Sequence, residues 1–196
     1  MSRLEALLSS TPASVCGEIG LDKLTAKREA AEGQDWTEIY AKQKKVFERQ
    51  LQLAASLNKP VVCHCVNSYG DIYDTFTSGI ALPPKIYMHA YGGSADFAKN
   101  LQRLRGTDVY FGFAAAINLK SKKTEDVLEG IPAERVLLES DLEQPQRLDE
   151  CITEMLKVIA RVKKITVGAA QELTFQNGQA FYNTMATPRG AAEPNM

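Results

Sequence analysis

The chain has 196 residues, with 23 Lys and Arg against 24 Asp and Glu, so its formal net charge is -1. Its 44% hydrophobic and 24% charged residues are typical of a globular domain, which excludes a collagen-like repeat, a coiled-coil rod and a wholly disordered chain. The near-zero net charge also argues against a protein that binds nucleic acid mainly through a basic surface.

The chain has no run of about 18 apolar residues, and residues 1–15 lack a basic start followed by an apolar stretch. The sequence therefore predicts no membrane span and no secretory signal, and we expect a cytoplasmic or nuclear protein. The four cysteines are too few and too unevenly spaced for a disulfide framework. We expect them to be mostly buried thiols: Cys16, Cys63, Cys65 and Cys151.

Short apolar segments alternate with helix-like segments along the chain. The first segment is predicted to be a helix with Leu4, Leu7 and Leu8 on its apolar face. The predicted strands are 14–19, 60–66, 85–89, 108–113 and 135–139. The sequence also predicts a long helix at 35–57 and shorter helices at 68–77, 94–105, 124–129, 145–162 and 168–182. This alternation favours βα units around a parallel sheet, and hence an α/β fold.

The clearest predicted helix is residues 35–57. Its apolar residues recur at helical spacing and lie on one stripe: Trp36, Ile39, Tyr40, Phe47, Leu51 and Ala54. Asp35, with Glu38 three residues later, is typical of a helix N-cap. The lysines on the polar side are expected to face solvent: Lys42, Lys44 and Lys45.

The length and pattern indicate one domain over residues 1–182. Residues 183–196 lack periodicity and include Thr-Pro-Arg-Gly-Ala-Ala-Glu-Pro, so we expect a disordered tail there.

The chain has two histidines, and each lies at the end of a predicted strand. His64 belongs to the segment Val-Val-Cys-His-Cys, and His89 to the segment Ile-Tyr-Met-His-Ala. Two acidic residues, Glu18 and Asp141, lie at the ends of other predicted strands. Because the carboxyl ends of parallel strands gather at one face, these four side chains are expected to converge. Imidazole and carboxylate groups together suit a divalent metal ion.

Structural roles compete with this metal site. A strand-end histidine is more often a hydrogen-bonded structural residue, and strand-end acids often cap helices. The residues alone leave the two interpretations about equal. A Cys-x-Cys metal site at Cys63 and Cys65 is disfavoured, because His64 between them points to the opposite face of a strand.

Four ordered motifs carry a family resemblance. Residues 17–22 read Gly-Glu-Ile-Gly-Leu-Asp, residues 60–65 Pro-Val-Val-Cys-His-Cys, residues 89–94 His-Ala-Tyr-Gly-Gly-Ser, and residues 138–141 Leu-Glu-Ser-Asp. In this order and spacing they closely resemble the TatD-like metal-dependent hydrolases. The resemblance covers about residues 15–182 and is closest to a fungal branch of the family.

The resemblance implies a (β/α)8 barrel of the amidohydrolase type that hydrolyses ester or phosphodiester bonds, with DNA as the expected substrate. It implies divalent metal ions, two in the full family site, of Mg, Mn or Zn. Glu18 would be shared between the two metals, His64 and His89 would bind the second metal, and Asp141 would bind the first and act as a base for water. The catalytic residues would thus be Asp141 and Glu18.

The chain also departs from the family pattern. No histidine precedes His64, so the family's opening His-x-His pair is absent, and about five of eight βα units are expected. An alternative is therefore a truncated, catalytically impaired member that acts as a protein-interaction partner. Unpaired barrel edges and an exposed apolar interior are expected to favour a protein partner or self-association.

A further candidate is a lysine cluster that follows the predicted strand 108–113. Lys120 and Lys122, with Lys123 beside them, are placed on the predicted active face and would contact substrate phosphates. An ordinary solvated loop is the more frequent role for such lysines.

Overall fold

The computed structural model describes residues 2–30 and 34–182, so the predicted tail at 183–196 lies outside the described residues. Five strands form one parallel sheet in the order β1-β2-β3-β4-β5. They are β1 (Cys16–Asp22), β2 (Val61–Val66), β3 (Lys85–Met88), β4 (Asp108–Ala114) and β5 (Val136–Glu139). The predicted α/β class and all five predicted strands are confirmed.

Nine α-helices are described around this sheet. They are α1 (Ser2–Ser10), α2 (Lys23–Glu29), α3 (Trp36–Ser56), α4 (Tyr69–Thr77), α5 (Ala95–Gln102), α6 (Ala115–Asn118), α7 (Thr124–Gly130), α8 (Leu148–Lys163) and α9 (Val167–Tyr182). The sequence pattern missed α2 and α6, because each spans at most two turns and shows too little periodicity. None of the helices in the described ranges is long and apolar enough to cross a membrane.

The structure confirms the Asp35 cap and corrects the face of the first helix. The Asp35 carboxylate accepts a hydrogen bond from the Thr37 N–H at 2.9 Å and caps α3. In α1, Leu8 is buried and Leu4 is partly buried, but Leu7 is 56% exposed. The prediction that Leu7 lies on the buried face is wrong, because α1 contacts the core through Leu4 and Leu8 alone of these three leucines.

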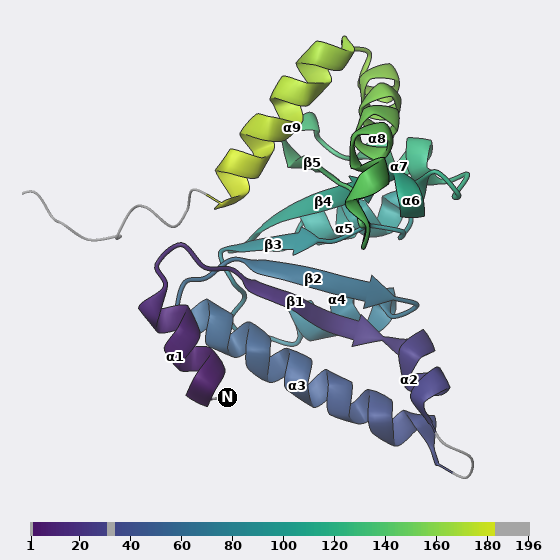
Figure 1. Cartoon of the computed structure of the whole chain (residues 1–196). Coiled ribbons are helices and arrows are strands. Elements are labelled where there is room, and N and C mark those ends of the chain that lie inside the picture. The colour runs from purple at the N-terminus through teal and green to yellow at the C-terminus, as the bar shows by residue number, and fades with distance from the viewer. Residues whose placement is uncertain (1, 31–33, 183–196) are drawn as a thin grey trace, which may run out of the picture.

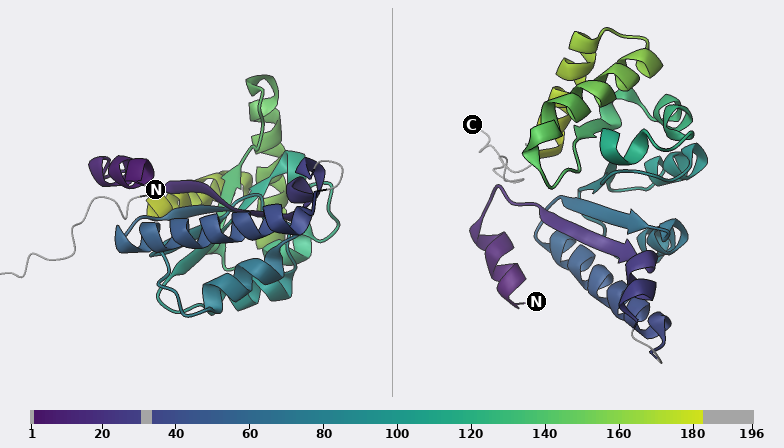
Figure 2. Two further views of the ribbon diagram at one scale, coloured as in Figure 1. Left: turned by 90° about the horizontal axis from the view of Figure 1, so that it is seen from below. Right: turned by 45° about the vertical axis from the view of Figure 1, so that its right-hand side comes forward.

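The helices flank a curved sheet whose edges are β1 and β5 (Figure 1). Helix α3 packs along β1, and α8 and α9 pack against β5. Figure 2 shows from two further directions that α1 and α3 lie on the β1 side, whereas α8 and α9 lie on the β5 side. Each edge strand has one strand partner among the described residues, as the expected unpaired edges require.

The two faces of the sheet carry different side chains. Ile86, Met88, Phe111 and Val136 belong to the main core, which the helices cover. The other face carries a smaller apolar cluster. Side chains alternate between the two faces of a strand, so the residue two positions after an apolar residue lies on this same face, and along β2, β3 and β5 it is polar. His64 thus follows Val62, His89 follows Tyr87, and Glu139 follows Leu137.

Helix α9 covers part of this inner face. Phe181 is fully buried against Tyr87 and Tyr110, with ring centroids 5.6 and 5.5 Å apart, and Leu137 lies in the same cluster. The expected exposed apolar interior is therefore wrong for β3 to β5. The reason is that the closing helix turns back over these strands.

An ion-pair network around Asp71 joins three helices. Asp71 of α4 accepts hydrogen bonds from Lys23 of α2 at 3.1 Å and from the Tyr40 hydroxyl of α3 at 2.8 Å. Lys44 of α3 donates to its other oxygen, so the expectation that Lys44 only faces solvent is wrong. Burial alone would raise the pKa of Asp71, but these hydrogen bonds outweigh it and lower the pKa to about 2.

Asp71→Asn is expected to lower the free energy of unfolding by about 1 to 2 kcal/mol at pH 7, a value discounted because the two lysines are partly exposed. Because folding depresses the pKa of Asp71, the stabilisation is present above about pH 4 and is lost as the pH falls towards 2. Urea unfolding at pH 7 and pH 3 measures the loss.

The matched control is Asp74→Asn, since Asp74 lies exposed on the same helix. Its free energy of unfolding is expected to stay near that of the wild type. A difference between wild type and Asp71→Asn that stays constant between the two pH values would contradict the prediction.

Candidate metal centre

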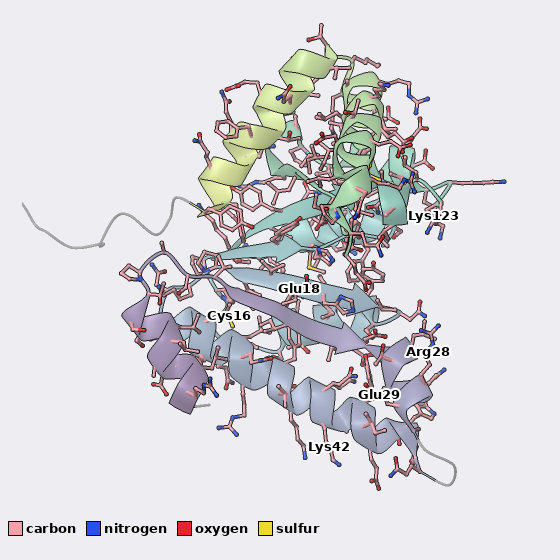
Figure 3. The ribbon with its side chains drawn as sticks, viewed as in Figure 1. Cys16, Glu18, Arg28, Glu29, Lys42 and Lys123 are labelled. Carbon is pink, nitrogen blue, oxygen red and sulfur yellow. The ribbon has the colours of Figure 1, made fainter. Side chains whose placement is uncertain are left out.

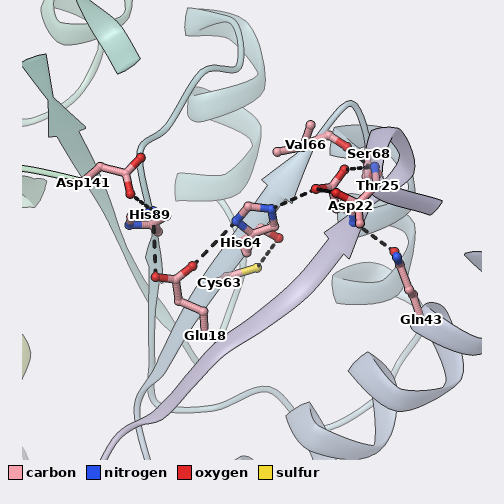
Figure 4. A network of polar contacts seen from close by, with 10 residues as sticks. All are labelled: Glu18, Asp22, Thr25, Gln43, Cys63, His64, Val66, Ser68, His89 and Asp141. Atoms are coloured by element: carbon pink, nitrogen blue, oxygen red, sulfur yellow. Dashed lines mark hydrogen bonds and ion pairs between the residues drawn. The ribbon is translucent and has the colours of Figure 1, made fainter. Parts of the chain in front are cut away.

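An irregularity in β1 places Glu18 at the inner face. Cys16 pairs with Val61, but Ile19 pairs with Cys63, so β1 advances by three residues over the stretch in which β2 advances by two. Such a bulge re-aims a side chain that regular alternation would place elsewhere. The Glu18 side chain is 48% exposed and lies near the middle of the molecule (Figure 3), between His64 of β2 and His89, which directly follows β3 (Figure 4).

Gly20 allows β1 to approach β2 closely beside the site. Gly20 pairs with His64, and a Cβ atom at Gly20 would lie 1.9 Å from the His64 carbonyl oxygen. Only glycine fits this position without displacing the backbone. The Gly-Glu-x-Gly spacing therefore has a direct steric reason.

Glu18 lies between the two histidines. Its Oε2 atom is 3.6 Å from His64 Nδ1, and its Oε1 atom is 3.8 Å from His89 Nε2. The two imidazole rings are stacked, with centroids 6.4 Å apart. One ligand atom from each of the three residues lies within 4.8 Å of the others, a spacing that suits a shared metal ion.

Asp141 approaches the same group from the loop after β5. Its Oδ1 atom is 3.3 Å from His89 Nε2 (Figure 4). Asp141 has a φ of 49°, in the left-handed region that Asp tolerates better than most residues. The structure thus brings Glu18, His64 and His89 together as one set and places Asp141 against His89.

The charge of these groups favours a cation. Burial alone would lower the pKa of His89, but three neighbouring carboxylates, with Glu139 acting most strongly, raise it to about 9. Without a metal, the imidazole holds a proton that offsets part of the negative charge. Imidazole and carboxylate ligands suit zinc and manganese, so the described residues fit a divalent ion.

Other polar residues near the site have structural roles. Asp22 lies 3.6 Å from His64 Nε2, but its carboxylate caps α2 by accepting from the Thr25 N–H at 2.8 Å. Cys63 is buried in the core, and burial raises the pKa of Cys65 to about 12. In the metal-free chain, burial therefore keeps both thiols protonated at neutral pH.

A cavity of about 770 Å³ opens beside these groups. It is lined by Glu18, His89, Glu139 and Asp141, and by Tyr182 of α9. Lys120 and Lys122 are exposed between α6 and α7 and do not line it. Figure 3 shows the neighbouring Lys123 to the right of α8, away from Glu18 near the centre of the view. Their phosphate contact stays a prediction.

The sequence reasoning missed one residue of the site. Glu139 Oε2 lies 2.5 Å from His89 Nδ1, and its side chain is only 14% exposed. The signal was present in the segment Leu-Glu-Ser-Asp, where Glu139 precedes Asp141 by two residues. Because Glu139 lies at the end of a predicted strand, the sequence pattern does not distinguish it from any other acidic residue at a strand end.

Glu18→Gln is expected to weaken Mn²⁺ binding by at least about 10-fold, because even outer partners of metal ligands contribute about 10- to 100-fold. Isothermal titration calorimetry on chelator-treated protein measures the affinity. The matched control is Glu29→Gln at the exposed end of α2, which is expected to bind like the wild type. Equal Mn²⁺ affinities for wild type and Glu18→Gln would contradict this ligand assignment.

The chain is similar in sequence to curated proteins of known name. The Cut9-interacting protein scn1 of Schizosaccharomyces pombe is 28% identical over 214 residues, covering 89% of this chain and 64% of scn1. The 3'-5' ssDNA/RNA exonuclease TatD of Edwardsiella piscicida is 31% identical over 145 residues, covering 70% of this chain and 49% of the exonuclease. The chain therefore spans about half to two thirds of the length of these relatives.

Solved structures show the same fold. The structure of YJJV, a TATD homolog from Escherichia coli K12, matches 95% of this chain and 70% of that chain, with a TM-score of 0.74 and 23% identity. An uncharacterized amidohydrolase from Saccharomyces cerevisiae matches with a TM-score of 0.66 and 19% identity, covering 92% of this chain and 69% of that one. The five-stranded parallel sheet is thus part of a (β/α)8 barrel fold.

The family assignment follows from a match over most of the sequence. A family model described as TatD related DNase matches residues 1–183. The matched range includes Glu18, His64, His89 and Asp141. The chain belongs to the TatD-related DNase family.

Proposed function

We propose that the chain forms part of a divalent-metal-dependent hydrolase that cleaves phosphodiester bonds, with DNA as its substrate. The observation that carries the proposal is the convergence of Glu18 of β1, His64 of β2 and His89, which directly follows β3, on three neighbouring parallel strands. Family membership supports the reaction class, and the Edwardsiella relative is named an ssDNA/RNA exonuclease.

The described residues suggest how metal would be held. Glu18, His64 and His89 would bind one ion, and Glu18 and Asp141 are the carboxylates available to a second. Magnesium, manganese and zinc all suit such ligands. A divalent ion in such a site lowers the pKa of bound water towards about 7 and polarises a phosphoryl oxygen.

The chain's own residues have distinct roles in this proposal. Asp141 would accept the proton of the attacking water, because its carboxylate lies at the cavity and beside His89. Glu18 would orient the water and the phosphodiester from β1, across the site from Asp141 after β5. Lys120 and Lys122 would contact phosphates of the nucleic acid beyond the cavity.

A second candidate function is that of a protein-interaction partner. The relative scn1, which covers 89% of this chain, is named for its interaction with Cut9. The edge strands β1 and β5 offer unpaired backbone groups that another chain, or a second copy, would cover. A measured complex with Cut9 together with an absence of hydrolysis would favour this function.

The cysteines support a reducing compartment. All four are free thiols, and three are buried. We therefore propose that the protein acts in the cytoplasm or nucleus.

Asp141→Asn is expected to lower the rate of hydrolysis of end-labelled single-stranded DNA by about 100-fold or more, since a general base contributes about 10²- to 10⁴-fold. Product formation in Mn²⁺ and in Mg²⁺, resolved on a denaturing gel, measures this rate. Parallel reactions with duplex DNA and RNA identify the preferred substrate.

The matched control is Asp96→Asn, since Asp96 is a highly exposed acid at the start of α5. It is expected to hydrolyse DNA at the wild-type rate. The proposal fails if the wild-type protein hydrolyses nothing in either metal, or if Asp141→Asn retains the full rate.

A further inference from the structure

Glu139, at the end of β5, contacts both the side chain and the backbone of the segment that follows β3. Its Oε2 atom lies 2.5 Å from His89 Nδ1, whereas its Oε1 atom accepts a hydrogen bond from the Ala90 N–H at 2.6 Å. Both carboxylate oxygens are thus used, and each faces a different group of the segment that follows β3. The Glu139 and His89 side chains are only 14% and 12% exposed, so water competes weakly for these bonds.

The surrounding backbone is shaped around this carboxylate. A Cβ atom at Gly112 of β4 would lie 2.2 Å from Glu139 Oε1 and 2.4 Å from the Tyr87 ring. Only glycine leaves the space through which Glu139 crosses β4 to reach His89. Ala90 has a φ of 39°, and this left-handed turn aims its N–H back at Glu139.

Tyr87 supplies a further hydrogen bond to Glu139. Burial, together with the charge of Glu139 and this hydrogen bond, raises the pKa of Tyr87, so the hydroxyl stays neutral and donates. With Tyr87, Ala90 and His89 all facing it, Glu139 is surrounded by donors.

These contacts decide which nitrogen of His89 is free. Because Nδ1 faces a carboxylate at 2.5 Å, Nδ1 carries the proton in the neutral imidazole. The lone pair is then on Nε2, the atom that faces Glu18 at 3.8 Å and Asp141 at 3.3 Å. An imidazole with the opposite tautomer would direct an N–H at the place where a cation would sit.

We propose that Glu139 is a positioning residue that fixes His89 in the metal-binding tautomer and orientation. This inference rests on the proposed metal-dependent function and adds the residue that prepares one ligand for it. Glu139 itself is not a ligand in this arrangement, because Oε2 faces His89 Nδ1, on the side of the ring away from Nε2, and Oε1 accepts from the Ala90 N–H. Carboxylate partners of this kind typically contribute about 10- to 100-fold to metal affinity.

Glu139→Gln is the informative variant because it keeps the size of the side chain and changes its donors. If the amide oxygen accepts from the Ala90 N–H, the amide NH₂ faces His89 Nδ1 and forces the proton onto Nε2. If the amide turns over, its NH₂ faces the Ala90 N–H and that bond is lost. The first arrangement opposes metal binding through Nε2, whereas the second keeps the proton on Nδ1 but loses the Ala90 bond and the negative charge that hold the ring.

The first measurement is Mn²⁺ affinity by titration calorimetry on chelator-treated full-length chain. Glu139→Gln is expected to bind about 10- to 100-fold more weakly than the wild type. The matched control is Glu143→Gln, the same change at an exposed acid that lines the same cavity, which is expected to stay within about twofold. An equal loss in both variants would overturn the proposal, because it would reduce the effect to charge alone.

The second measurement is nitrogen-15 NMR of the histidines in metal-free protein at about pH 10, above the raised pKa of His89, where the imidazole is neutral and its tautomer can be identified. The chain has two histidines, so a His64→Gln variant assigns both rings. The wild type and Glu143→Gln are expected to show a strongly downfield proton on His89 Nδ1, and Glu139→Gln is expected to lose it. The same resonance in all three proteins would overturn the proposal.

A milder variant covers the case in which Glu139→Gln does not fold, as judged by its circular dichroism. Tyr87→Phe removes one donor to Glu139 but keeps the ring packed on Phe181, and about a 2- to 5-fold loss of Mn²⁺ affinity is expected. Unchanged affinity in this variant would count against the network. A wild-type chain that binds no Mn²⁺ would overturn the proposed function, whereas the NMR measurement still decides the role of Glu139.

Discussion

The close approach of β1 to β2 at Gly20 is the constraint on which the site depends. The missing side chain lets the Gly20 backbone lie against the His64 carbonyl, where a Cβ would be 1.9 Å from the oxygen. The bulge just before it then turns Glu18 onto the inner face. Without this local geometry, Glu18 would not lie between the two histidines, and the candidate metal centre would lose its central carboxylate.

The site concentrates negative charge in a partly buried place. Glu18, Glu139 and Asp141 all approach His89, and two of them, Glu18 and Asp141, face its Nε2 atom. Carboxylates placed so closely need a proton or a cation between them. The raised pKa of His89 and the fit to a divalent ion are two consequences of the same arrangement.

Helices on the β1 side and on the β5 side of the sheet support the strands that carry the site. On the β1 side, Asp71 ties α2, α3 and α4 together through Lys23, Tyr40 and Lys44. On the β5 side, Phe181 of α9 closes over the inner apolar cluster. The two edge strands lie between these supports, in a chain that spans 64% of the length of scn1 and 70% of the YJJV structure.

The sequence by itself determined the parallel α/β fold, because alternating short apolar segments and helical stripes leave few other arrangements. It also determined that Glu18, His64, His89 and Asp141 meet, since the carboxyl ends of parallel strands share one edge. Only the tertiary structure decided the contact of Glu139 with His89, because it joins β5 to the end of β3 across Gly112. Such contacts depend on a side chain crossing a neighbouring strand, and local spacing along the chain carries no record of that path.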